Sequence, residues 1–167
     1  MLPFVFLGVT TTIRSELRPG DLAYILQAHH RHYYPDFGYG APFEAIVAGA
    51  LAETYALTEG KRTRWWIVEG EGRRQGSLVL LDRGEAAQLR FFFLEPGARG
   101  QGIGKQLLDA FLHHLQTHHF RSAYLWTTAS QQTACGLYAH YGFRITERQE
   151  TTTFGVLQEE LKYELHR

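Results

Sequence analysis

The chain has 167 residues, of which 44% are hydrophobic and 14% aromatic, enough for one domain with a sizeable core. Seventeen basic residues balance seventeen acidic ones, which argues against a nucleic-acid partner or an anionic membrane surface. The single cysteine, Cys135, cannot form an internal disulfide and suits a reducing compartment, so we expect a cytoplasmic protein.

The N-terminal stretch 1–9 reads MLPFVFLGV. It is apolar, but it is far shorter than the roughly 20 apolar residues of a membrane-spanning helix. It also lacks the basic start of a signal peptide. We expect a lead-in or an extra edge strand before a single domain that spans 1–167, and no membrane partner.

The remaining elements follow from hydrophobic spacing and from turn residues. Runs rich in β-branched residues predict strands, and apolar residues three and four apart predict helices. Asp21 after Pro19-Gly20 predicts a helix N-cap, and Pro42 predicts the first turn of a second helix. In chain order, we expect a strand over 10–17, a helix over 21–32, an aromatic loop over 33–42, a helix over 42–55, strands over 65–69, 76–82 and 87–95, a helix over 102–119, a strand over 122–128, a helix over 131–141, and strands over 143–149 and 154–165.

This order, β-α-α-β-β-β-α-β-α-β-β, predicts an α/β (α+β) fold with a mixed sheet of about seven strands and helices on both faces. The three strands between 65 and 95 form an antiparallel meander. Helical crossings on both sides of the strand at 122–128 predict parallel neighbours there.

The most informative stretch is 89–105, LRFFFLEPGARGQGIGK. A buried strand ends at Pro96, and a glycine-rich loop then opens into a helix near Gly102. Glycines let a backbone come close to a ligand, and the first turn of a helix has unpaired N–H groups at the positive end of its dipole. The stretch therefore predicts a phosphate or pyrophosphate site.

Two well-known phosphate loops do not fit this spacing. A Walker A loop needs glycine five residues before Gly104, where the chain has Arg99, and Ser or Thr after Lys105, where it has Gln106. A dinucleotide fingerprint would need its third glycine at Lys105 or at Leu107.

The loop instead resembles the acetyl-CoA loop of the GNAT acetyltransferases, Arg/Gln-x-x-Gly-x-Gly/Ala, which stands here as RGQGIG over 99–104. The preceding FFLEP over 92–96 resembles the end of the family's strand. The stretch ACGLYAHYGF over 134–143 resembles its A-x-x-L-Y-x-x-x-G-F motif. The resemblance runs from about Thr12 to Leu165 and is closest to the acetyltransferase half of bacterial helix-turn-helix regulator fusions. It implies a GNAT fold, and the predicted element order agrees.

The resemblance implies acetyl-CoA as co-substrate and no metal. Backbone N–H groups of the loop would bind the pyrophosphate, and the backbone of the preceding strand would bind the pantetheine arm. The N–H of Leu94 would be the oxyanion donor at the thioester. Gln131 stands where the family often has Asn. The cofactor-binding residues that it implies are Phe92, Phe93, Leu94, Arg99, Gly100, Gln101, Gly102, Ile103, Gly104, Lys105, Gln131 and Tyr138.

Tyr138 is the predicted general acid for the departing thiolate, because its family counterpart lies near the CoA sulfur. A phenol of pKa about 10 can share or deliver a proton to a thiolate of pKa about 8.5. The alternative is an aromatic of the helix–sheet core. The general base stays open among carboxylates such as Glu44, Glu85 and Glu95.

The acceptor should bind near the first two helices, where aromatic residues cluster. The candidates are Tyr33, Tyr34, Glu44 and Trp126, the last of which faces either the pocket or the core. His114 and His118 have zinc-helix spacing, but Leu115 replaces the required Glu, which favours a solvated helix end.

Together these features predict an N-acetyltransferase, an acyltransferase that acts on a primary amine of a small molecule or peptide in a ternary complex. Transfer of another acyl group, or acetylation of a protein lysine, remains an alternative. A catalytically idle acyl-CoA sensor or interaction module is a second. We expect a monomer or homodimer with no nucleic-acid partner.

Overall fold

The computed structural model describes residues 11–59 and 62–166, so the segment expected over 1–9 lies outside the described residues. The elements are β1 Thr12–Arg14, α1 Asp21–Phe37, α2 Ala41–Ala56, β2 Arg64–Gly70, β3 Arg73–Arg83, β4 Ala86–Leu94, the 3-10 turn η1 Pro96–Ala98, α3 Ile103–Thr117, β5 Ser122–Thr128, α4 Gln132–His140, β6 Arg144–Thr151 and β7 Gln158–His166.

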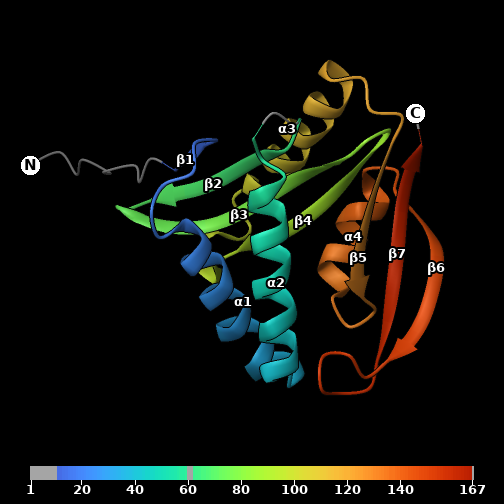
Figure 1. Ribbon diagram of the computed structural model, residues 1–167. Coiled ribbons are helices and arrows are strands. Elements are labelled where there is room, and N and C mark those ends of the chain that lie inside the picture. Colours follow the sequence, from blue (N-terminus) through green and yellow to red (C-terminus); the bar gives the residue numbers. More distant parts are fainter. Residues whose placement is uncertain (1–10, 60–61, 167) are drawn as a thin grey trace, which may run out of the picture.

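The strands form one seven-stranded sheet in the order β1-β2-β3-β4-β5-β7-β6. Neighbouring strands are antiparallel except for β4 and β5, which are parallel. Helices α1 and α2 cover one face of the sheet, and α3 and α4 cover the other (Figure 1). The predicted fold class, mixed sheet and element order are confirmed.

The core has two layers, one on each face of the sheet. The larger layer packs α3 and α4 against the sheet through residues such as Leu107, Phe111 and Phe143, all buried. The smaller layer packs α1 and α2 against the other face through Ile25, Val47 and neighbouring aromatic side chains. Alternate residues of the central strands serve opposite layers, as the pleat requires: on β2, Trp66 and Val68 belong to the larger layer and Trp65 and Ile67 to the smaller one.

The predicted loop at 33–42 is wrong over its first half, because α1 continues to Phe37 with Pro35 inside it. The rings of Tyr33 and Phe37, four residues apart on one helix face, pack 5.8 Å from each other and against Tyr39. This aromatic packing offsets the lost N–H of Pro35. The helix ends at Gly38, whose φ of +72° only glycine adopts readily.

Asp21 does not cap this helix, since the N-cap position belongs to Gly20. Its buried carboxylate instead accepts hydrogen bonds from the guanidinium groups of Arg14, at 2.7 and 2.9 Å, and Arg74, at 2.6 Å. The carboxylate thus ties the start of α1 to β1 and β3.

The expected parallel pairing on both sides of β5 is confirmed for β4 and wrong for β6. Strand β7 inserts between β5 and β6 and runs antiparallel to both. Because β6 and β7 form a hairpin, either strand can lie next to β5, and local sequence patterns do not decide which one does.

Strands β4 and β5 are paired only over Ala86–Gln88 and Ser122–Tyr124, near one end of each strand. Further along, the pairing of β4 with β3 shifts register between Ser77 and Val79, and Phe91 has a φ of +49°. The hydroxyl of Ser77 donates a 2.7 Å hydrogen bond to the carbonyl of Phe91. This bulge accompanies the divergence of β4 from β5, and the sheet is open at this point.

Candidate active site

A cavity of about 800 Å³ lies at the open end of β4 and β5. Its walls are the C-terminal half of α1, the end of β4 with the glycine loop, and the first turns of α4. The residues proposed from sequence that line it are Tyr33, Phe92, Phe93, Leu94, Arg99, Gly100, Gly102, Gly104, Lys105 and Gln131.

The glycine loop forms the part of the wall at the start of α3. Gly100 and Gly102 have φ values of +74° and +78°, in the left-handed region that favours glycine. Gly102 stands directly before the helix, so the first N–H groups of α3 are at the loop. The buried side chain of Ile103 fixes the helix start to the core, and the amide of Gln101 donates a 2.7 Å hydrogen bond to the Gly97 carbonyl.

The end of β4 turns polar backbone groups toward the opening. The N–H of Glu95 donates to the carbonyl of Gln75 on the β3 side, at 2.8 Å. Because backbone groups alternate along an antiparallel strand, the N–H of the preceding Leu94 is directed away from β3. The carbonyl of Leu94 accepts a 2.9 Å hydrogen bond from Arg99 Nε, which holds that guanidinium at the loop.

Tyr33 and Gln131 join the two helical walls of the cavity. The hydroxyl of Tyr33, on α1, donates a 3.3 Å hydrogen bond to Gln131 Oε1 at the start of α4. Burial raises the pKa of Tyr33 to about 12, so this hydroxyl keeps its proton at physiological pH. The Gln131 amide in turn donates to Thr128 Oγ1 at 3.2 Å.

Tyr138 lies behind the α4 wall, one helical turn from Ala134, which lines the cavity. Its ring is 5% exposed and packs 6.1 Å from Phe92 and 5.9 Å from Tyr163. Burial raises its pKa well above the usual phenol value, so the hydroxyl is protonated. Tyr138 packs against Phe92, which lines the cavity, and it also belongs to the core. Both the general-acid and the core interpretation of the sequence are compatible with this place.

His32 of α1 pairs with Glu95, which directly follows β4, and sequence reasoning did not identify this pair. His32 lines the cavity, and its Nε2 is 2.8 Å from Glu95 Oε2. The Tyr24 hydroxyl, at 3.2 Å, and the Arg31 guanidinium both donate to the other oxygen of Glu95. His32 and Glu95 are 63 residues apart, so no local motif joins them.

Tyr34 and Glu44 lie away from the cavity. Tyr34 is 55% exposed and stacks on His30, and a Glu44 oxygen is 3.9 Å from His30 Nδ1.

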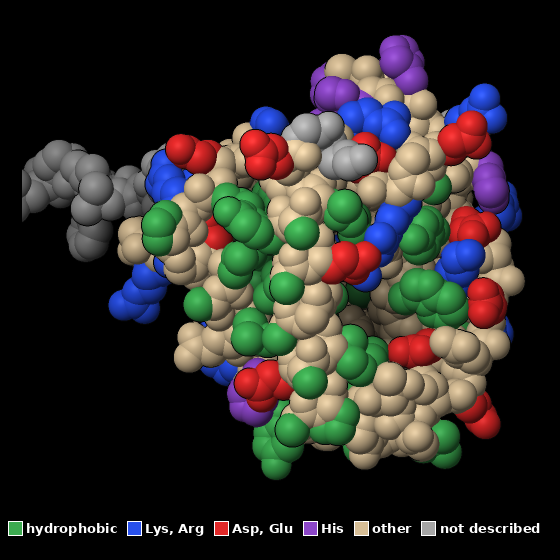
Figure 2. All heavy atoms as spheres, viewed as in Figure 1, with side chains coloured by type: hydrophobic (Ala, Val, Ile, Leu, Met, Phe, Trp, Pro, Cys, Tyr) green, Lys and Arg blue, Asp and Glu red, His purple; other side chains and the backbone are tan. Residues whose placement is uncertain are grey.

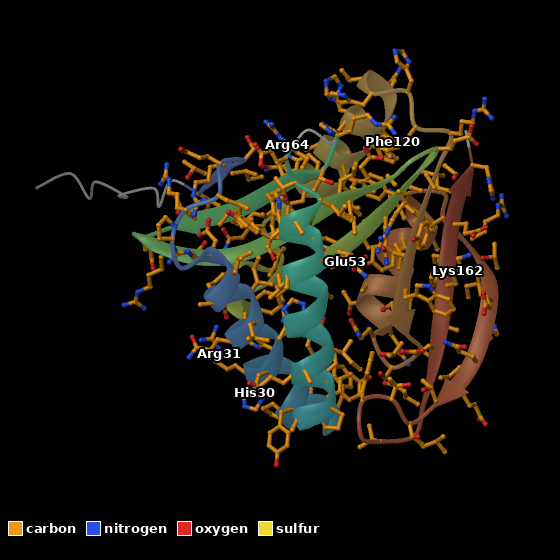
Figure 3. All side chains as sticks on the ribbon, viewed as in Figure 1. His30, Arg31, Glu53, Arg64, Phe120 and Lys162 are labelled. Carbon is orange, nitrogen blue, oxygen red and sulfur yellow. The ribbon has the colours of Figure 1, made fainter. Side chains whose placement is uncertain are left out.

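Trp126 faces the same side of the sheet as α1 and α2, because its neighbour Leu125 points into the opposite core layer. It is 38% exposed and pairs in register with Lys162 of β7. Figure 2 shows a hollow on this side between α2 and the strands β5 and β7. Figure 3 labels Glu53 on α2 and Lys162 on β7, the elements on the two sides of this hollow.

Within residues 11–59 and 62–166, no group of three His, Cys, Asp or Glu side chains is placed to hold a metal ion. His114 Nε2 is instead 2.9 Å from the Arg62 carbonyl, and the centroid of its ring is 4.0 Å from that of His118, with the two rings tilted by 35°. In the same described part of the chain, no helix is both long and apolar enough to cross a bilayer.

Residues 24–143, which include the glycine loop and the whole motif over 134–143, match the Acetyltransferase (GNAT) family. The chain belongs to the GNAT acetyltransferase family. The predicted family and the predicted enzyme class, an acyltransferase, are therefore confirmed.

Individual relatives agree with this GNAT assignment. The chain is 31% identical over 97 residues to "Uncharacterized N-acetyltransferase YjgM" of Escherichia coli strain K12, a match covering 56% of this chain and 58% of that protein. A crystal structure of an acetyltransferase from Streptococcus agalactiae superimposes with a TM-score of 0.74 at 19% identity, over 94% of this chain and 98% of that one. A crystal structure of a GNAT acetyltransferase from Elizabethkingia anophelis with acetyl-CoA bound superimposes with a TM-score of 0.66 at 16% identity, over 94% of this chain and 98% of that one.

Proposed function

We propose that this GNAT protein transfers an acetyl group from acetyl-CoA to a primary amine of a small molecule or peptide, by direct attack in a ternary complex. The observation that carries the proposal is the 800 Å³ cavity, in which the glycine loop, the end of β4 and the start of α4 share one space. A volume of this size suits a cofactor-sized ligand.

The cofactor would bind along these three segments. Backbone N–H groups from Gly100 to Gly104, at the positive end of the α3 dipole, would bind the pyrophosphate. The positive charges of Arg99 and Lys105, both in the cavity wall, would add to that attraction. The exposed backbone at Phe92 and Leu94 would bind the pantetheine arm, and Gln131 would contact it from the α4 side.

In the chemical step the amine nitrogen attacks the thioester carbonyl carbon, and the carbon–sulfur bond then breaks. The N–H of Leu94 would stabilise the oxyanion, an effect worth about 3 kcal/mol elsewhere. Tyr138 would give its proton to the departing thiolate. The attacking nitrogen loses one proton, so the balance of the reaction also needs a base.

The acceptor would reach the thioester from the side of α1 and α2, where Tyr33 lines the cavity. Trp126 of β5 faces the same side of the sheet and is half-exposed. Large aromatic surfaces of this kind supply contact area for a ligand. The proposal also includes a cytoplasmic location, a monomeric or dimeric state, and a similarity to the acetyltransferase half of helix-turn-helix fusions.

The decisive experiment is calorimetric titration with acetyl-CoA, followed by a thiol-release assay over a panel of amines. We expect saturable binding and thiol release with at least one amine. Binding without release across amines, peptides and other acyl-CoAs would favour the acyl-CoA sensor. Absence of acetyl-CoA binding would overturn the proposal.

A further inference from the structure

We propose that His32 is the general base of this acetyltransferase and that Glu95 holds it in place, an inference that rests on the function proposed above. The starting observation is that His32 lines the cavity while its Nε2 lies 2.8 Å from a carboxylate. Among the residues that the structure describes, His32 has the only imidazole that lines this cavity.

The bond to Glu95 sets which ring nitrogen can take a proton. A carboxylate accepts hydrogen bonds, so Nε2 carries the hydrogen and Nδ1 carries the lone pair. This arrangement, in which a carboxylate orients an imidazole that receives a proton on its other nitrogen, is the one used by hydrolase triads. When Nδ1 takes the amine proton, the Glu95 carboxylate stabilises the resulting imidazolium.

Glu95 is itself fixed from two sides, which makes it a positioning residue. The Tyr24 hydroxyl and the Arg31 guanidinium both donate to Oε1, while Oε2 accepts from His32. The carboxylate is 22% exposed. Arg31 and His32 lie in the same turn of α1, where Figure 3 labels Arg31. One turn of the helix therefore supplies both the imidazole and a guanidinium that fixes Glu95.

The ring of His32 lies close to the strand that would hold the cofactor. Its centroid is 4.7 Å from that of Phe93, which stands between Phe92 and Leu94 in the cavity wall. Tyr138, the proposed acid, is on α4, which covers the opposite face of the sheet (Figure 1). The amine proton and the thiolate proton would therefore be exchanged on opposite sides of the thioester.

The neighbouring His29 is a weaker candidate for the same step. Its Nδ1 is 2.7 Å from the Ile25 carbonyl, and burial lowers its pKa to about 4. It is also packed between Tyr33, Phe43, Phe91 and Phe93 rather than along the cavity. The charged and titratable groups around His32 are Glu95, Arg31, Tyr24 and His29, with Tyr33, Asp36, Arg99 and Lys105 along the same cavity wall.

The kinetic test compares His32→Ala, His32→Gln and Glu95→Gln with the wild type. We expect His32→Ala to lower kcat about 10²–10⁴-fold, the usual contribution of a general base, with the acetyl-CoA dissociation constant changed less than about threefold. In the wild type, one limb of the kcat/KM–pH profile should stay at the same pH when amines of different basicity are compared. That limb should be absent from the profiles of both His32 variants. Added imidazole should partly restore the kcat of His32→Ala. Glu95→Gln should show a smaller loss of kcat, with this limb of the profile at a different pH.

His113→Gln is the matched control, because His113 is an exposed histidine on α3 that does not line the cavity. Its kcat and pH profile should equal those of the wild type. Thermal unfolding of all variants shows whether each one is folded. Unchanged kcat in folded His32→Ala, or retention of the pH limb, overturns the assignment while leaving the acetyltransferase proposal intact.

A second test needs no acceptor. Bromoacetyl-CoA carries an electrophilic carbon next to the thioester, so an imidazole nitrogen within reach forms an N–C bond while bromide leaves and the ring proton goes to solvent. We expect a mass increase on His32 that excess acetyl-CoA prevents. Labelling elsewhere, on Tyr33 or Cys135 for example, or no labelling of a protein that binds the reagent, overturns the placement of His32 at the acyl group. Labelling of His32 in a protein that acetylates no amine would instead count against the proposed function alone.

Discussion

The hydroxyl of Ser77 on β3 donates a 2.7 Å hydrogen bond to the carbonyl oxygen of Phe91 on β4, and Phe91 has a φ of +49°. A positive φ is costly for a phenylalanine and persists only where its surroundings hold it. Ser77 is fully buried and Phe91 is partly buried, so the bond is partly shielded from water. The pair therefore maintains the bulge at which β4 diverges from β5.

Ser77→Ala should lower the free energy of unfolding by about 1–3 kcal/mol, because it leaves the partly buried Phe91 carbonyl without its donor. It should also weaken acetyl-CoA binding, since the cavity forms at this bulge. Urea unfolding and calorimetry measure the two effects. Ser130→Ala, at the edge of the same cavity but remote from the bulge, should leave the stability within about 0.5 kcal/mol. Equal stabilities for the two variants would contradict the role given to Ser77.

Gly102→Glu should abolish acetyl-CoA binding, since a side chain and a negative charge would enter the proposed phosphate site. Gly72→Glu is a close control: Gly72 has a φ of +70°, compared with +78° for Gly102, and an added Cβ meets no atom within 4 Å at either position. Both variants should lose about 1–2 kcal/mol of stability from the left-handed backbone. Calorimetry should show loss of binding in Gly102→Glu alone. Normal binding by that variant would mean that the loop does not hold the phosphates.

Tyr138→Phe should reduce kcat about 10²-fold or more while acetyl-CoA affinity is retained, because only the proton donor is removed. Tyr163→Phe removes the same atom from a tyrosine whose ring lies 5.9 Å away in the same core and should keep most of the activity. Steady-state kinetics with the best amine makes the comparison. Similar activities for the two variants would identify Tyr138 as a packing residue.

Asp21 should make the stability depend on pH. Burial raises its pKa, but hydrogen bonds from Arg14, the Arg18 backbone and Arg74 together lower it, and the net pKa is below the usual value. A carboxyl with a lowered pKa in the folded state stabilises the fold above its unfolded pKa of about 3.9 and loses that contribution as pH falls through the folded value. Removing the charge leaves two arginines facing a neutral partner.

Asp21→Asn should therefore cost about 3–5 kcal/mol at neutral pH, measured by urea unfolding. The difference between the wild type and the variant should narrow as the pH falls from 5 toward 3. A constant difference over this range would show that the carboxylate charge does not contribute.

Trp126→Ala should raise the KM for the amine several-fold and leave the stability within about 0.5 kcal/mol, because this side chain is 38% exposed beside the proposed acceptor entrance. Tyr55→Ala, on a residue that is 59% exposed at the end of α2, should change neither quantity. Kinetics over the amine panel tests both variants. An unchanged KM for every amine would exclude Trp126 from the acceptor site.

Local patterns predicted much of this fold. The strand over 122–128 has the bounds of β5, and the antiparallel meander expected between 65 and 95 is formed by β2, β3 and β4. Both follow from alternation and turn residues, which are properties of neighbouring residues. The glycine loop is predicted in the same way, because the residues of its motif are six consecutive positions of the sequence.

The features that the sequence did not predict depend on contacts between distant residues. Helix α1 passes through Pro35 because aromatic packing offsets a local penalty. The place of β7 beside β5 is a choice between two strands of a hairpin. His32 and Glu95 come together only when α1 packs next to the end of β4. Each outcome depends on tertiary packing, which no short window of sequence contains.

The short pairing of β4 with β5 has a mechanical consequence. The pairing of β4 with β5 joins the four strands β1–β4 to the three strands β5–β7 over only the three residue pairs from Ala86 to Gln88. The seams on either side of it, β3–β4 and β5–β7, have seven residue pairs each, so the β4–β5 seam is a weak line through the middle of the sheet. A ligand bonded to both sides of the opening would act as an added strand and stiffen that line. Amide hydrogen exchange along β4 and β5 should slow in the presence of acetyl-CoA more than exchange along the fully paired β2 and β3.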